Sequence, residues 1–178
     1  MTISIKPTAS GSTIEQDGST ILTVDGSGNI TPSNDLYPKV PAFSAALSAN
    51  QSISHNTWTK IPYDTKGFDT TSDYDNATNY RYTPSVAGYY QVNAGGYIIN
   101  TTGFTGTAIY KNGSFAKRGS SDAPSSANSV QSINSALIYL NGSTDYLEVY
   151  VYQGSGSAKN LSGNSSQTYF QAYLARAV

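Results

Sequence analysis

The stretch Tyr146-Leu147-Glu148-Val149-Tyr150-Val151-Tyr152 shows the fold class most clearly. Its aliphatic residues alternate with tyrosines and one glutamate, which is the period of two of a β-strand that buries one face. We expect Leu147, Val149 and Val151 to face the core. The opposite face, with Tyr150 and Tyr152, is more amphipathic than a solvated face requires, and it predicts an interface.

The same pattern recurs in short pieces from residue 41 onward, at the spacing typical of a β-sandwich or barrel. The predicted strands are residues 42–47, 59–61, 80–83, 88–99, 107–111, 114–118, 129–139, 145–153 and 168–175. Asn112-Gly113 is a strong hairpin signal, and Asn141-Gly142 ends a strand in the same way. The residues lack sustained helical periodicity, so we predict an all-β domain.

The composition of the chain excludes several classes of protein and of site. The 178 residues are 12% charged with a net charge of −1, which argues against a nucleic-acid binder. Cysteine is absent and His55 is the single histidine, which excludes thiolate and multi-histidine metal centres. No apolar run approaches about 18 residues, so we expect neither a membrane span nor an apolar signal segment.

Residues 1–40 have a different sequence pattern from the rest of the chain. Short β-prone pieces at 13–16, 20–24 and 29–31 are separated by turn-forming pairs such as Asp17-Gly18. Pieces this short do not close a core alone, so the segment needs a partner surface. Pro38 and Pro41 mark a boundary, and we predict two domains, 1–40 and 41–178.

Several motifs after residue 40 occur in an order typical of one family. They are Pro41-Ala42-Phe43-Ser44-Ala45, Tyr82-Thr83-Pro84 followed by Gly88-Tyr89-Tyr90, Ile109-Tyr110-Lys111-Asn112-Gly113, and Thr168 to Leu174. In these residues the chain resembles the C1q/TNF-like jelly roll. The resemblance implies a ten-stranded jelly-roll sandwich, a homotrimer around a threefold axis, and binding through loops. We predict a trimer interface at Tyr150, Tyr152, Tyr89 and Tyr97.

Two polar stretches, 117–130 and 154–167, are predicted to be exposed loops that contact a receptor. Their candidate residues are Lys117, Arg118, Asp122, Lys159, Asn160 and Asn164. Ser, Asn and Gly side chains give adaptable hydrogen bonding, which suits glycans. The alternative is that both loops are inert spacers.

Residues 13–34 resemble the short leader of bacteriophage structural proteins, particularly marine and cyanobacterial phage fibre-like proteins. The resemblance implies a virion protein that assembles in the host cytoplasm, with other virion proteins and a host surface glycan as partners. The first hypothesis is a trimeric fibre-like appendage attached by its N-terminal segment. The alternatives are a capsid decoration or head-fibre protein, and a secreted bacterial C1q-like adhesin or coat protein.

An enzyme is not expected. His55 lies in a polar stretch with no local triad motif, and Ser114-x-x-Lys117 falls on a predicted hairpin strand rather than at a helix start. We expect no cofactor. Calcium is the one metal considered, and its candidate ligands are Asp64, Asp69, Asp73 and Asp75. This cluster lacks the glycine and distal glutamate of an EF-hand, and it equally fits a solvated loop.

Overall fold

The computed structural model describes residues 3–16, 18–32 and 40–178. Contacts within the chain define two compact units, Met1–Lys39 and Val40–Val178. The structure is 62% strand and the described residues contain no helix, hence none long and apolar enough to cross a membrane. The prediction of an all-β protein is confirmed. The turn expected at Asp17 and the proline expected at the boundary, Pro38, lie outside the described residues.

The first unit is a four-stranded antiparallel meander. Its strands are β1 (Ile3–Thr8), β2 (Gly11–Gln16), β3 (Ser19–Asp25) and β4 (Ile30–Pro32). The carboxylate of Asp25 accepts hydrogen bonds from the backbone N–H groups of Ser27 and Asn29, both at 2.9 Å, and this closes the β3–β4 turn. The N-terminal strand β1 is a strand that the sequence analysis did not predict.

Pairing in this meander gives the sheet one apolar face. The register pairs Ile5 with Ile14 and Ile14 with Leu22, while Val24 pairs with Ile30. Side chains of paired residues lie on the same face. The apolar face therefore consists of Ile5, Ile14, Leu22, Val24 and Ile30. Ile5 is 71% exposed and Ile30 64% exposed. The described part of this unit contributes nothing to the hydrophobic core, which lies in the second unit.

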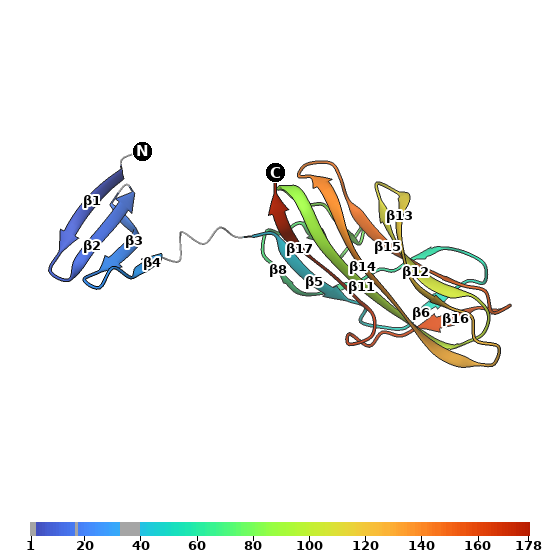
Figure 1. The fold of residues 1–178 in the computed structure, drawn as a ribbon. Helices are drawn as coiled ribbons and strands as arrows, with labels where there is room; N and C mark the ends of the chain where they lie inside the picture. The colour runs from blue at the N-terminus through green and yellow to red at the C-terminus, as the bar shows by residue number, and fades with distance from the viewer. Residues whose placement is uncertain (1–2, 17, 33–39) are drawn as a thin grey trace. The chain divides into compact units, whose positions relative to one another are not determined.

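The second unit is a sandwich of two sheets, in which the long strands β14, β11, β17 and β5 run side by side (Figure 1). The first, here called the β11 sheet, consists of β14 (Asn128–Asn141), β11 (Ala87–Thr101), β17 (Tyr169–Ala177), β5 (Ala42–Ala46), β8 (Thr65–Asp69), β16 (Lys159–Leu161) and β6 (Gln51–Ile53). The second, the β15 sheet, consists of β13 (Ser114–Asp122), β12 (Thr105–Lys111), β15 (Leu147–Gln153), β10 (Arg81–Tyr82), β9 (Tyr74–Asp75) and β7 (Thr59–Lys60).

The sandwich core confirms the predicted alternation in β15, because Leu147, Val149 and Val151 are all buried. An aromatic cluster around Phe43 joins the two sheets. The Phe43 ring stacks on Tyr74 at 4.7 Å and on Tyr82 at 4.4 Å between ring centroids, and it meets the edge of Phe170 at 4.9 Å. Aromatic pairs of this geometry add to the free energy gained by burying the rings. Part of the high tyrosine content therefore builds the core.

The predicted hairpin at Asn112-Gly113 is also confirmed. Lys111 pairs with Ser114, and the two turn residues have φ of 53° and 74°. Positive φ at both central positions is the geometry of a type I′ turn, which asparagine and glycine adopt at little steric cost.

Both predicted loops contain strand. Strand β13 continues to Asp122, which pairs with Thr105, so Lys117, Arg118 and Asp122 lie on a strand rather than in a loop. Strand β16 interrupts the second stretch because Leu161 is buried and pairs with β6. The polar composition concealed both strands, since their outward positions are filled by Ser, Lys, Arg and Asn.

Candidate functional site

The outer face of the β11 sheet carries a broad set of exposed apolar side chains. Strand alternation and pairing place on it the tyrosine face, defined as Tyr89, Tyr97, Ile133, Leu137, Tyr139, Tyr169 and Tyr173. Leu137 is 55% exposed and Ile133 48% exposed. The rings of Tyr89 and Tyr139 lie 5.6 Å apart between centroids. Large apolar side chains left exposed together on one sheet face indicate an interaction site.

Polar side chains in the middle of the tyrosine face bond to one another across strands. The amide of Gln91 donates to the hydroxyl of Ser135 at 2.9 Å, and the amide of Gln171 donates to Ser44 at 3.1 Å. The middle of the face is therefore polar, and its large apolar side chains lie around it. A hollow of about 410 Å³ also lies on this face, lined by Asn93, Ile133, Ser165, Ser166, Tyr169 and Gln171.

The four tyrosines expected at one interface are divided between opposite faces of the sandwich. Tyr89 and Tyr97 lie on the tyrosine face, whereas Tyr150 and Tyr152 lie on the outer face of the β15 sheet. Each pair therefore belongs to a separate outer face, and the assignment of all four tyrosines to a trimer interface stays a prediction. Sequence analysis overlooked Ile133, Leu137 and Tyr173. For Ile133 and Leu137 the polarity of β14 gave no usable signal, because the polar Ser132 and Asn134 lie inside.

The outer face of the β15 sheet carries a second cluster, here called the aromatic–arginine patch. It consists of Trp58, Phe104, Tyr110, Phe115, Arg118, Tyr150 and Tyr152. Tyr110 and Tyr150 are 4.2 Å apart between ring centroids, and Trp58 and Tyr152 are 5.3 Å apart. Four separate segments supply these side chains, and cross-strand pairing brings them together.

Polar groups border this patch. Lys60 pairs with Glu148 at 2.7 Å, and the hydroxyl of Tyr150 donates to the other oxygen of Glu148 at 3.3 Å. Partial burial of the Tyr150 phenol, together with the negative charge of Glu148, raises the pKa of Tyr150 to about 12. The hydroxyl of Tyr152 donates to Asn56 Oδ1 at 2.8 Å. At neutral pH the Tyr150 phenol is therefore a protonated hydrogen-bonding group.

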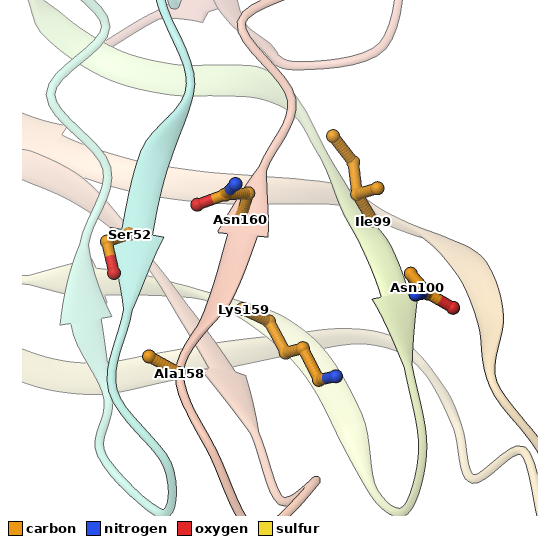
Figure 2. A pocket seen from close by; sticks show the side chains of 6 residues that line it. All are labelled: Ser52, Ile99, Asn100, Ala158, Lys159 and Asn160. Carbon is orange, nitrogen blue, oxygen red and sulfur yellow. The ribbon is translucent and has the colours of Figure 1, made fainter.

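A shallow hollow of about 390 Å³ contains two of the predicted receptor residues, Lys159 and Asn160 (Figure 2). Ser52 of β6, Ile99 and Asn100 of β11, and Ala158 complete its lining. Figure 2 shows the Lys159 side chain extending toward the β11 side of the hollow. Asn164 lies apart from this lining, where its side-chain Oδ1 accepts a hydrogen bond from the Ser166 backbone N–H at 3.0 Å and fixes a turn.

The four acidic candidates for calcium are not brought together as a ligand set. Asp64, Asp69, Asp73 and Asp75 each accept hydrogen bonds from nearby protein groups, which include those of Ser48, Tyr74, Ser85 and Thr78, respectively. Backbone hydrogen bonds from Thr78 and Ala77 hold the pKa of Asp75 well below its usual range. Within residues 3–16, 18–32 and 40–178, no three acidic or histidine side chains form a group that could hold a metal.

The residues considered for catalysis, His55, Ser114 and Lys117, hold structural positions. His55 Nδ1 accepts a hydrogen bond from the Gly156 backbone N–H at 2.9 Å, which ties two loops together. Ser114 and Lys117 lie on strand β13, as the hairpin prediction required. Neither arrangement supplies the held nucleophile and base that acyl-transfer chemistry needs.

Comparison with known proteins bears on the fold of the second unit. The structure is similar to the globular domain of zebrafish complement 1qA, with a TM-score of 0.59 at 16% identity, covering 78% of this chain and 99% of that one. It is similar to murine APRIL, with a TM-score of 0.61 at 11% identity, covering 76% and 98%. PRD1 vertex protein P5 gives a TM-score of 0.54 at 18% identity, covering 77% and 98%. No family model and no curated protein matches the sequence.

The fold is therefore a C1q/TNF-like jelly roll, as the motifs indicated. Identities this low establish the fold, and function has to be argued from the surfaces themselves.

Proposed function

We propose that this protein is a trimeric, fibre-like appendage of a phage particle, attached through its first unit and contacting the host surface through its jelly roll. The observation that carries this proposal is the pair of uncovered apolar faces, one on each unit. A phage vertex protein among the structural neighbours supports a place in a virion.

Trimerisation is assigned to the tyrosine face. Its exposed residues include Tyr89, Leu137 and Tyr173, and they lie on the same sheet face. Burial of apolar surface contributes about 25 cal/mol for each Å² removed from water, and a stable interface buries on the order of 800 Å² per partner. Association would cover the tyrosine face of each subunit with a different surface of its neighbour, and the proposal places the aromatic–arginine patch outside this contact.

Attachment is assigned to the apolar face of the first unit. A single-layer sheet with exposed Ile5 and Ile30 buries too little surface to be stable by itself. Docking onto another virion protein would cover this face. The opposite face remains polar, with Lys6 paired to Glu15 at 2.5 Å.

The second candidate function is capsid decoration, in which the first unit clips onto the shell. The same vertex protein supports this alternative as much as the first, since its name places it on a particle vertex. Copy number distinguishes the two functions, because an appendage is present in few copies and a decoration protein in many.

The test is quantitative mass spectrometry of purified particles together with an incorporation assay. We expect the full chain to associate with particles, and a variant with both Ile5→Asn and Ile30→Asn to be lost from them. The matched control carries Thr20→Asn and Thr31→Asn, on the polar face of the same sheet, and should be incorporated normally. Absence of the native protein from particles would overturn the proposal.

A further inference from the structure

The aromatic–arginine patch presents accessible ring surface. Phe115 is 47% exposed and Phe104 is 37% exposed, while Trp58 is half-buried beside them. Their rings are in contact with the patch rather than isolated, since Trp58 lies 5.8 Å from Phe115 between centroids. The patch is therefore a rigid aromatic platform on the outside of a sheet.

Arg118 lies over this platform. Its guanidinium carbon is 5.5 Å from the ring centroid of Phe104, 5.6 Å from that of Phe115 and 6.0 Å from that of Trp58. Such cation–π contacts restrain the side chain and leave the N–H donors at its edge available. Arg118 is exposed. In the part of the chain that the structure describes, its side chain pairs with no carboxylate, whereas Lys60 pairs with Glu148 and Lys111 with Asp145.

The ligand that fits this arrangement has an apolar flat face and one negative charge. A sugar ring presents a face of C–H groups that packs on aromatic rings, and a carboxylate accepts two parallel hydrogen bonds from a guanidinium. Asn56 and the hydroxyls of Tyr150 and Tyr152 supply hydrogen-bonding groups at the border of the patch.

The charge of the patch favours a singly charged anionic ligand over a more highly charged one. Lys60, a second cation beside the patch, is neutralised by Glu148, so the patch's own positive charge is that of Arg118. A hexuronate, with a charge of −1, is matched by that guanidinium. A phosphate monoester carries a charge of about −1.5 to −2 near neutral pH and would be left with uncompensated charge.

We propose that the aromatic–arginine patch binds an acidic saccharide of the hexuronate type, with a sugar ring on Trp58 and Phe115 and the carboxylate on Arg118. This inference deepens the proposed function, because it gives the host contact a ligand class and moves it from the loops to a sheet face. It rests on that function for the biological source of the sugar. The chemistry of binding is argued from the residues of the patch alone.

Trp58 is the single tryptophan of the chain, so its fluorescence reports on the patch. The purified full chain is titrated with oligomers of galacturonic acid, guluronic acid and glucuronic acid, with a neutral oligosaccharide and a sugar phosphate as comparisons. We expect saturable fluorescence change with at least one hexuronate oligomer, and weaker binding of the neutral and phosphorylated sugars.

Two variants locate the site. Arg118→Gln should weaken hexuronate binding by roughly tenfold or more, since it removes a charge-assisted pair. Lys117→Gln makes the same charge change on the adjacent residue of β13, and should alter binding less than about twofold, because a strand's neighbouring residues face opposite sides. Arg118→Lys keeps the charge without the planar fork and should give an intermediate affinity.

Failure of all three hexuronates to bind, equal binding of the neutral sugar, tighter binding of the sugar phosphate, or equal weakening by Lys117→Gln would each overturn this assignment. Because the titration uses purified protein, its failure is distinguishable from failure of the proposed function. If particles contain the protein but the patch binds no sugar, only this inference fails. If the patch binds sugar but particles lack the protein, only the proposed function fails.

Discussion

The side-chain amide of Asn134 donates a hydrogen bond of 2.6 Å to Thr107 Oγ1 and so joins β14 of the β11 sheet to β12 of the β15 sheet. The Ser132 hydroxyl lies 2.8 Å from the same Thr107 oxygen, and it accepts from Thr107 N–H at 2.9 Å. All three residues are buried. At this edge the two sheets are joined by polar side chains.

Thr107→Val should therefore destabilise the protein although it preserves side-chain shape. The substitution removes the acceptor of Asn134 and a partner of Ser132, and an unsatisfied buried polar group costs about 1–3 kcal/mol. We expect the free energy of unfolding in urea to fall by this amount. Thr78→Val, at an exposed position without a side-chain hydrogen bond, is the control and should change it little. Equal stability of both variants would contradict the role given to this network.

The same network explains why the sequence predicted strand β14 but not the orientation of its faces. Alternation over residues 129–139 predicted a strand, which the structure confirms as Asn128–Asn141. Its inward face contains Ser132 and Asn134, while Ile133 and Leu137 point outward. A prediction from polarity alone would have placed Ile133 inside and Ser132 and Asn134 outside. Only the hydrogen bonds to β12 and β13 show why the polar residues are inside.

Leu137→Asp combined with Tyr89→Ser should convert the expected trimer to monomer. The carboxylate introduced by the first change would stay solvated only if the contact is broken. The second change removes a large ring that the interface would bury. Sedimentation equilibrium measures the mass directly. Phe115→Ser, an equally exposed change on the opposite face, should leave a trimer. If Tyr150→Ser with Tyr152→Ser gives monomer and Leu137→Asp with Tyr89→Ser does not, the interface lies on the β15 sheet instead.

Acid should weaken the fold partly through Asp75. Its carboxylate accepts backbone hydrogen bonds from Ala77, Thr78 and Asn79, and its pKa is lowered by them. The folded pKa lies below the unfolded value of about 3.9, so this stabilisation is complete above pH 4 and is lost as pH falls further. Asp75→Asn removes the titration. We expect the fall in Tm between pH 6 and pH 2.5 to be smaller in the variant by roughly 3 °C.

Asp122→Asn provides the comparison for this pH dependence. Asp122 is exposed at the end of β13. Because Asp122 accepts one backbone hydrogen bond where Asp75 accepts three, its variant should follow the fall in Tm of the native protein more closely than Asp75→Asn does. An identical fall in Asp75→Asn would mean that the hydrogen bonds around Asp75 contribute nothing measurable to stability.

The aromatic–arginine patch shows the limit of reading motifs along a chain. Arg118 was among the predicted receptor residues, but as part of a loop. Trp58, Phe104 and Phe115 were not, because they are distant in sequence and each is an unremarkable residue in its own segment. The pairing of Ala108 with both Tyr150 and Arg118 brings these segments together. Such a site follows from strand register, which short motifs do not determine.

Residues 40–178 should fold without the first unit. The described buried apolar residues all belong to this part of the chain, and the structurally similar C1q and APRIL domains are matched over 99% and 98% of their lengths. We expect the fragment 40–178 to unfold cooperatively, with a Tm within about 3 °C of that of the full chain.

The peptide 1–39 should behave differently when isolated. Its described strands β1–β4 leave Ile5 and Ile30 exposed, and a sheet without a second layer gains too little from burial to offset the ordering of its backbone. At micromolar concentration we expect far-UV circular dichroism of an unfolded chain. A monomeric peptide with the well-dispersed amide resonances of a folded sheet would show that the apolar face needs no cover, and would remove the main argument for attachment through it.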